Sequence, residues 1–212
     1  MERIATDEHV FIAGKTGSGK SFLAEVYLAG FEYVVMLDTK GQSLERRKKG
    51  EGLWRGLREG KDFVLIERLA ELNEVETKKI IYCPIPEEQN EEYYDLLMKW
   101  VYDRQNTVLW IDELMQVCPS PFKYPFHLKS LYTRGRFVDS VVWACTQRPA
   151  TIPSDVISNS THYFVFDLNK AADRKRMSDD TGCDEFLERP GYRNFWYMKD
   201  TMEQPVLATL KP

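Results

Sequence analysis

The chain has 212 residues, of which 43% are hydrophobic and 29% are charged, and its formal net charge at pH 7 is -4. A chain of this length can bury a large core without disulfides or metals, and residues 1–212 are predicted to form a single domain. The acidic balance excludes a protein coated in basic residues. It leaves room for nucleic acid held by a local patch or by the inner surface of a ring.

The cysteines and the N-terminus indicate where the protein works. The four cysteines lie far apart, and none has the spacing of a zinc site, which indicates reduced thiols in an intracellular protein. The N-terminus carries charges where a signal peptide has an apolar core, and no apolar run reaches about 20 residues, the length that spans a bilayer. We therefore expect a soluble protein that is not secreted.

Apolar runs bounded by turns predict buried strands at residues 10–13, 33–37, 63–66, 80–83, 108–111, 141–145 and 163–166. Helical patterns lie between several of them, at residues 21–29, 88–103 and 126–137. This alternation predicts an α/β fold of three layers with a mainly parallel central sheet. The tail differs, because residues 191–199 and 204–210 predict a C-terminal β-hairpin that turns at residues 200–203. The polar stretch 41–60 yields the least certain prediction.

A phosphate-binding loop directly follows the first predicted strand. The pattern Gly-x-x-x-x-Gly-Lys-Ser/Thr is matched without a mismatch by Gly14, Lys15, Thr16, Gly17, Ser18, Gly19, Lys20 and Ser21. Glycines allow the backbone N–H groups and the start of the next helix to face the phosphates. Lys20 is expected to reach the outer phosphates and the Ser21 hydroxyl to ligate Mg²⁺, so the loop predicts binding of a nucleoside triphosphate.

Two carboxylates end the strand predicted at residues 108–111. Asp112 is expected to hold Mg²⁺, and Glu113 to orient and deprotonate the water that attacks the γ-phosphate. The alternative is that the pair merely caps the next helix, where acids are favoured. Because the phosphate loop lies upstream, the catalytic interpretation is preferred. A phosphate loop with such a glutamate is typical of a RecA-like (ASCE) P-loop NTPase.

Polar groups flank the next predicted strand. Gln147 follows it and is expected to face the same crevice as Asp112, where its amide can sense the γ-phosphate, although a plain turn before Pro149 is the alternative. Arg134 and Arg136 precede the strand, and either guanidinium can bond a phosphate in planar geometry. If the arginine came from a neighbouring subunit, hydrolysis would depend on assembly.

These motifs, taken in order, carry a resemblance to a known family. Together with residues 37–41, the segments 14–21, 108–113, 135–136 and 146–149 resemble the FtsK/HerA superfamily of DNA-pumping ATPases. The short chain looks most like the genome-packaging ATPases of tailless icosahedral double-stranded DNA viruses with an internal membrane, over residues 10–166. The residue after Arg136 is a bulky Phe137, where the family often has a small one.

The resemblance implies roles and partners. It implies Lys20 and Ser21 for phosphate and Mg²⁺, Asp112 for the metal, Glu113 as the base, Gln147 as the sensor, and Arg136, or else Arg134, as the finger acting on a neighbour. It also implies ATP as the nucleotide, double-stranded DNA as the cargo, a homo-oligomeric ring of six subunits, and contacts with capsid or vertex proteins and with virion membrane proteins. Such a protein works in the host cytoplasm or in association with the virion. Residues 38–40 fit the end of the family's second strand, but we expect them only to form a turn.

Two other classes share the loop. A regulatory GTPase is suggested by residues 38–41, which fit Asp-x-x-Gly, but the guanine-reading Asn-Lys-x-Asp is lacking and residues 167–170 have those residue types in the wrong order. A small nucleotide kinase would need an arginine-rich lid, for which Arg174 and Arg176 are candidates, but it leaves Glu113 and Gln147 unexplained. The basic residues at 46–49 are candidates for DNA contact, or else a solvated face balanced by nearby glutamates.

Overall fold

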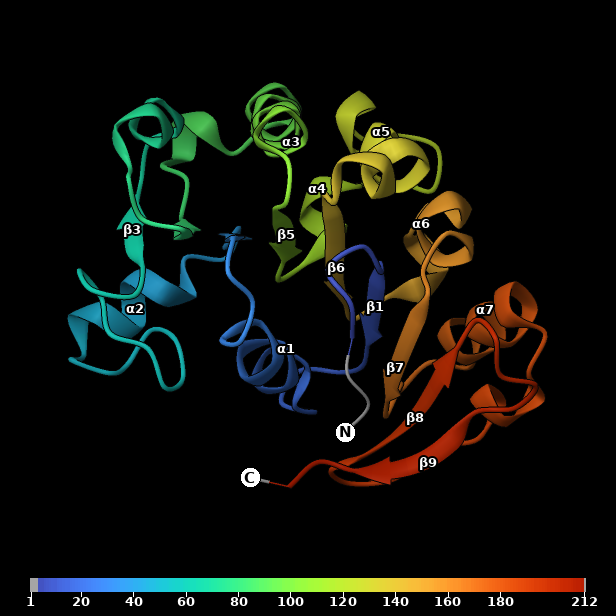
Figure 1. Ribbon diagram of the computed structural model, residues 1–212. Helices are drawn as coiled ribbons and strands as arrows, with labels where there is room; N and C mark the ends of the chain where they lie inside the picture. Colours follow the sequence, from blue (N-terminus) through green and yellow to red (C-terminus); the bar gives the residue numbers. More distant parts are fainter. Residues whose placement is uncertain (1–3, 212) are drawn as a thin grey trace.

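The computed structural model describes residues 4–211, and nine strands form one sheet among them (Figure 1). The sheet order is β3-β4-β2-β5-β6-β1-β7-β8-β9. The strands are β1 (Val10–Ala13), β2 (Val34–Leu37), β3 (Val64–Ile66), β4 (Lys79–Tyr82), β5 (Val108–Ile111), β6 (Val141–Thr146), β7 (His162–Phe166), β8 (Asn194–Lys199) and β9 (Val206–Thr209). Strands β1 to β7 pair in parallel, and β8 and β9 add antiparallel pairs at the edge beside β7.

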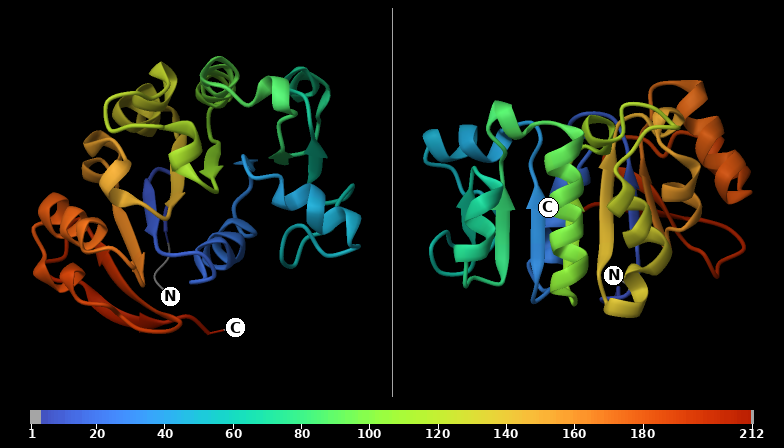
Figure 2. Two further views of the ribbon diagram at one scale, coloured as in Figure 1. Left: turned by 180° about the vertical axis from the view of Figure 1, so that it is seen from behind. Right: turned by 90° about the horizontal axis from the view of Figure 1, so that it is seen from above.

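Helices cover both faces of the sheet, as a parallel sheet requires. The α-helices are α1 (Lys20–Leu28), α2 (Gln42–Lys48), α3 (Glu91–Arg104), α4 (Leu114–Val117), α5 (Phe126–Arg134), α6 (Ser154–Ser158) and α7 (Ala171–Thr181). Figure 1 shows α1 and α2 below the sheet and α3, α5 and α6 above it, and Figure 2 shows the C-terminal hairpin at the far edge of the sheet. The expected three-layer α/β fold with a C-terminal hairpin is confirmed.

The alternation of side chains along each strand builds two cores. In β1, Phe11 and Ala13 pack with α3, α5, α6 and α7, whereas Val10 and Ile12 pack with α1. Side chains in a strand point alternately to its two faces, so every residue of β1 is buried on one side or the other. Both cores therefore hold β1 rigidly, and the loop that follows it starts from a fixed position.

Strand order places the polar residues. Strand β6 lies between β1 and β5, and β2 lies on the other side of β5. Since these strands are parallel, their carboxyl ends meet at one edge of the sheet, where they release Gly14, Asp38, Asp112 and Gln147. The insertion of one strand between the loop strand and the acid strand is the ASCE arrangement that was expected.

The structure differs from the sequence prediction at several boundaries. Helix α5 ends at Arg134 rather than 137, and a 3-10 turn over Gly135–Val138 follows it; the chain packs so closely there that a Cβ at Gly135 would lie 2.0 Å from the carbonyl oxygen of Ser140. Helices α6 and α7 follow no predicted pattern, and the polar stretch after residue 41 contains α2. Among residues 4–211, no helix has both the length and the apolar character needed to cross a bilayer.

Candidate nucleotide site

The phosphate loop curves tightly between β1 and α1. Its first amide, of Gly14, donates to the Thr146 carbonyl at 3.1 Å, and Gly17 and Gly19 adopt φ of +73° and +110°, a conformation that glycine tolerates best. The Lys20 ammonium lies inside the curve and donates to the carbonyls of Gly14 (2.7 Å) and Lys15 (3.1 Å). Burial lowers the pKa of Lys20, and the carboxylates of Asp112 and Glu113 oppose that effect.

The end of β7 holds the loop from its other side. The Lys15 amide donates to the Asp167 carbonyl at 2.9 Å, and its ammonium lies 2.7 Å from Asp167 Oδ2. Arg189 donates to both carboxylate oxygens of Asp167, at 2.6 Å each. These bonds, that of Arg189 above all, outweigh burial and lower the pKa of Asp167 to about 2. Asp167 thus stays ionised as the anchor of the loop.

The loop and its helix present groups suited to an anion. Helix α1 begins after Gly19 without a side-chain cap, so its first N–H groups remain directed at the loop. The Ser18 hydroxyl is buried and has no hydrogen-bond partner among the described residues. Free N–H groups, an enclosed hydroxyl and an ammonium around one curve match the needs of a polyphosphate.

A hydroxyl and a carboxylate meet beside the loop. Ser21 Oγ donates to Asp112 Oδ1 at 2.7 Å, and only 3% of Asp112 is exposed. These hard oxygen donors fit Mg²⁺, which is typically bound by one or two protein oxygens together with phosphates and water. The two residues predicted to hold the metal are therefore neighbours, although they lie 91 positions apart in the sequence.

Glu113 and Gln147 form a chain of hydrogen bonds to the loop. Gln147 donates from Nε2 to Glu113 Oε2 at 2.8 Å and from its backbone N–H to Glu113 Oε1 at 3.2 Å, while its Oε1 accepts from Thr16 Oγ1 at 2.7 Å. Glu113 is the N-cap residue of α4, but its side chain makes no capping bond there. Its carboxylate points to the crevice instead, and the capping alternative does not describe it.

Lys40 belongs to the site, and the sequence did not reveal it. Its ammonium lies 3.0 Å from Glu113 Oε2 and 3.8 Å from Asp112 Oδ2. Burial alone would lower the pKa of Lys40, but the two carboxylates outweigh burial and raise it, so the cation stays charged. The expected turn is present as well, since Asp38 accepts from the amides of Lys40 (3.1 Å) and Ser43 (2.6 Å). That turn aims Lys40 at the acids.

The two candidate finger arginines lie at the opposite edge of the sheet. Arg136 Nη2 donates to Thr161 Oγ1 at 2.6 Å and to the Asn159 carbonyl at 3.3 Å, both just before β7 begins. Arg134 is exposed at the end of α5. The six residues of β6, about 20 Å of strand, separate this edge from Gln147. Neither arginine is brought to the site of its own chain.

The candidates for other functions are engaged elsewhere. Arg174 donates to the carbonyls of Leu168 and Leu187, and Arg176 pairs with Asp180, so the proposed kinase lid is part of the packing around α7. In the basic run 46–49, three residues pair with glutamates: Arg46 with Glu25, Arg47 with Glu59 and Lys48 with Glu45. This agrees with a balanced surface.

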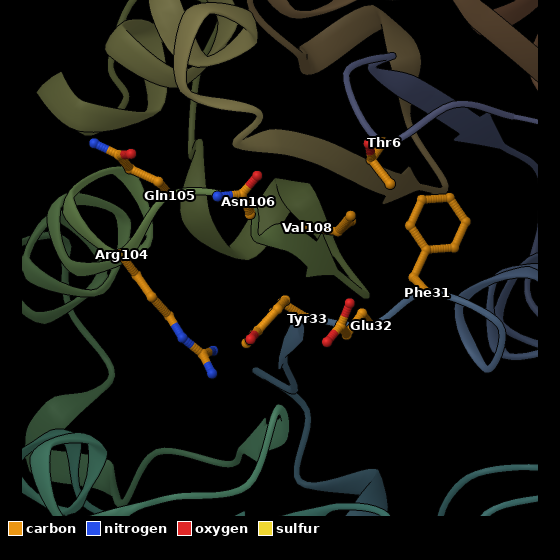
Figure 3. Close-up of a pocket in the computed structure, with 8 residues that line it drawn as sticks. All are labelled: Thr6, Phe31, Glu32, Tyr33, Arg104, Gln105, Asn106 and Val108. Atoms are coloured by element: carbon orange, nitrogen blue, oxygen red, sulfur yellow. The ribbon is translucent and has the colours of Figure 1, made fainter.

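Pockets lie at both edges of the sheet. A pocket of about 380 Å³ lies at the amino ends of β2 and β5, away from the predicted site residues, where Tyr33 and Arg104 line it (Figure 3). A smaller pocket of about 200 Å³ adjoins the phosphate loop and is lined by Gly17, Ser18, Gly19, Phe22, Tyr192, Arg193 and Leu210. The predicted nucleotide site lies at the smaller pocket, because three residues of the phosphate loop line it.

Fold and site together define a P-loop NTPase of the ASCE type. No protein-family model matches the chain, and no curated protein matches its sequence. Solved structures do share its fold.

The genome-packaging NTPase B204 of Sulfolobus turreted icosahedral virus 2, in complex with AMPPCP, has a TM-score of 0.73 at 14% identity, over 96% of this chain and 97% of that chain. The DNA-packaging ATPase B204 of Sulfolobus turreted icosahedral virus has a TM-score of 0.71 at 17% identity, over 95% and 96%. VirB4 of Thermoanaerobacter pseudethanolicus has a TM-score of 0.66 at 11% identity, over 99% and 93%. The two B204 proteins are packaging NTPases, the kind of protein that the motifs resemble, and at such identities the likeness establishes the fold.

Proposed function

We propose that this protein is an ATP-hydrolysing motor that translocates double-stranded DNA, the genome-packaging ATPase of a virus. The observation that carries the proposal is the bonded chain from Thr16 through Gln147 to Glu113, beside the Ser21 and Asp112 pair. Gln147, the proposed sensor, contacts both the phosphate-binding loop and Glu113, the proposed base. This arrangement suits hydrolysis that responds to the γ-phosphate. The fold shared with B204 over nearly the whole of both chains supports the same function.

Each residue has a role in this proposal. Loop amides and Lys20 bind the β- and γ-phosphates, and Ser21 and Asp112 hold Mg²⁺, which neutralises charge on the phosphates when bound. Glu113 accepts the proton of the attacking water. Gln147 orients that water or the γ-phosphate and transmits its presence to Thr16.

The two alternatives have less support. A regulatory GTPase needs a carboxylate that reads guanine, whereas Asp167 is bonded to Lys15 and Arg189. A nucleotide kinase needs a mobile arginine lid, whereas Arg174 is bonded to backbone carbonyls around α7. Neither alternative uses Glu113 and Gln147 together.

Assembly and partners complete the proposal. A single nine-stranded domain would work as a homo-oligomeric ring, six subunits by resemblance, with DNA in its channel and with capsid, vertex or virion membrane proteins at its contacts. It would act in the host cytoplasm or on the virion. The DNA contact would be to backbone phosphates, so affinity should fall steeply with salt.

Purified protein tests the proposal. We expect ATP hydrolysis that rises when linear double-stranded DNA is added, and Lys20→Ala should abolish nucleotide binding or turnover. Lys175→Ala, which removes an exposed lysine paired with Asp179, is the matched control and should leave both unchanged. Hydrolysis restricted to GTP, or phosphate transfer from ATP to a nucleoside, would contradict the motor.

A further inference from the structure

The pocket beside the phosphate loop has two unlike walls. One wall is Gly17, Ser18 and Gly19 with Phe22 of α1, and the other is formed by residues around the C-terminal hairpin. The walls are packed tightly, because a Cβ added to Gly19 would lie 2.4 Å from Leu210 Cδ2. The Leu210 amide donates to the Arg193 carbonyl at 2.8 Å, which closes the hairpin at this point. The hairpin therefore stands at a fixed place next to the loop.

The pocket offers aromatic faces. Tyr192 is 81% exposed, and the Arg193 guanidinium lies 5.3 Å from the centre of its ring, which leaves the other ring face open. Phe22 is partly buried in the opposite wall and carries the Arg55 guanidinium 4.4 Å from its centre. The exposed ring of Tyr192 beside the phosphate loop offers a flat π-face on which a base can stack.

The geometry points to this pocket as the nucleobase site, in which the purine of a bound nucleotide stacks on Tyr192 between the hairpin and the start of α1. The inference rests on the proposed function, since it takes the nucleotide's phosphates to lie in the loop. A base is joined to the phosphates through one ribose, so it must lie beside the loop, and this pocket adjoins three residues of the loop. The hairpin is thus a part of the active site.

The lining also sets base selectivity. Among the described residues that line the pocket, none carries a carboxylate to bind the exocyclic amine and N1–H of guanine. The polar side chains are Ser18, Tyr192 and Arg193, and both purines offer them a ring-nitrogen acceptor. Stacking tolerates any base with a broad π-face. The pocket should accept adenine and guanine with similar affinity and should hold pyrimidines less well.

Calorimetry with two ligands tests the inference on the full chain. AMPPCP carries a base, and inorganic tripolyphosphate carries none. Tyr192→Ala should weaken AMPPCP binding about tenfold, the effect of losing one stacked base, and should leave tripolyphosphate binding unchanged. Tyr192→Phe keeps the ring and should bind AMPPCP like the parent. Val206→Ala, which removes an exposed side chain of β9 that does not line the pocket, is the matched control.

The outcomes separate the inference from the function on which it rests. If Lys20→Ala abolishes AMPPCP binding but Tyr192→Ala does not weaken it, the base site is wrong and the nucleotide site stands. Equal losses of AMPPCP and tripolyphosphate in Tyr192→Ala would mean that the loop itself is damaged, and the base assignment would fall. If the parent binds neither ligand, both proposals fail. The guanine analogue GMPPCP should bind within about fivefold of AMPPCP, and a larger preference would overturn the stacking account.

Discussion

Glu113 is almost fully buried, and its carboxylate is the proposed proton acceptor. Only 1% of the residue is exposed, and its carboxylate touches Gln147 and Lys40. Glu113→Gln keeps the shape of the side chain and removes the proton acceptor. We expect kcat for ATP to fall by roughly 10² to 10⁴, the usual contribution of a general base, with AMPPCP binding retained. Steady-state turnover and calorimetry measure the two effects, and normal turnover by the variant would refute the assigned base.

Lys40 is a positioning residue in our interpretation. Its ammonium lies 3.0 Å from the Glu113 carboxylate, so Lys40→Met should let the base move and lower kcat about tenfold, the scale of one charge-assisted hydrogen bond. AMPPCP affinity should change little, and Lys40→Arg should restore part of the rate. Lys175→Met is the control, because its ion pair with Asp179 is exposed. A rate loss that only follows the unfolded fraction would reduce Lys40 to a structural role.

The contrast between these residues shows what the sequence could predict. The loop and the acid pair follow local patterns, so the motif predicted their positions before any fold was known. Lys40 lies in a segment whose turn was expected, but its chemistry depends on β2 lying next to β5. Strand order is set by packing of both faces and is not written in any local pattern. Lys40 was therefore missed, because its role depends on which strand lies beside β2 in the sheet.

At the scale of elements, His9 joins the loop strand to the sensor strand. It directly precedes β1, it is fully buried, and its Nδ1 accepts from the Val142 amide of β6 at 3.0 Å. Burial, and after it the charge of Arg136, lowers the pKa of His9 from 6.5 to about 3. The folded state thus keeps this imidazole neutral below pH 6.5, where the unfolded chain protonates it. Stability is lost as pH falls from 6.5 towards 3.

This linkage predicts a pH-dependent free energy of unfolding. Because of His9, the free energy of unfolding should be about 2 kcal/mol lower at pH 5 than at pH 7, since it falls by about 1.4 kcal/mol per pH unit below 6.5. His9→Asn removes the titration, so the stability gap between parent and variant should narrow by that amount over this range. Urea unfolding at pH 7, 6 and 5 measures the gap. Val206→Ala, which removes an exposed apolar side chain of β9 and no titratable group, should keep the parent's slope, and a constant gap for His9→Asn would contradict the linkage.

Elements with strong apolar patterns were predicted well, and polar ones were not. Strands β1 and β5 have the predicted bounds because each is a continuous apolar run buried on both faces. Helix α7 was missed because its sequence is rich in charge, and only Met177 and a few small or paired side chains are buried. Its position follows from tertiary bonds, such as that of Asp173 to Arg148. Such bonds leave no periodic signal.

At the scale of the whole molecule, the two edges of the sheet divide the chemistry. The carboxyl edge carries Glu113 and Gln147, and the amino edge carries Arg136, with the exposed Phe137 beside it. A rigid nine-stranded sheet cannot fold one edge onto the other, so if Arg136 acts on a nucleotide, it acts at the site of another copy. In a ring in which the amino edge of one subunit faces the carboxyl edge of the next, every site would be shared.

Mixing two inactive variants tests this arrangement. Arg136→Ala rings lack the finger and Glu113→Gln rings lack the base, so each should lose most turnover; an arginine finger contributes about 10³ to 10⁵ in rate. In mixed rings, some interfaces pair an intact Glu113 with an intact Arg136 from the neighbour, so ATPase activity should reappear and peak near equal proportions. Mixing Arg134→Ala with Glu113→Gln in the same way decides between the two arginines. Only the variant that lacks the true finger should be inactive alone and regain ATPase activity in the mixture. If Arg136 and Glu113 act within the same chain, no subunit of a mixed ring holds both, and activity cannot reappear. An absence of recovery in rings that still assemble would therefore place the effect of the arginine inside its own subunit.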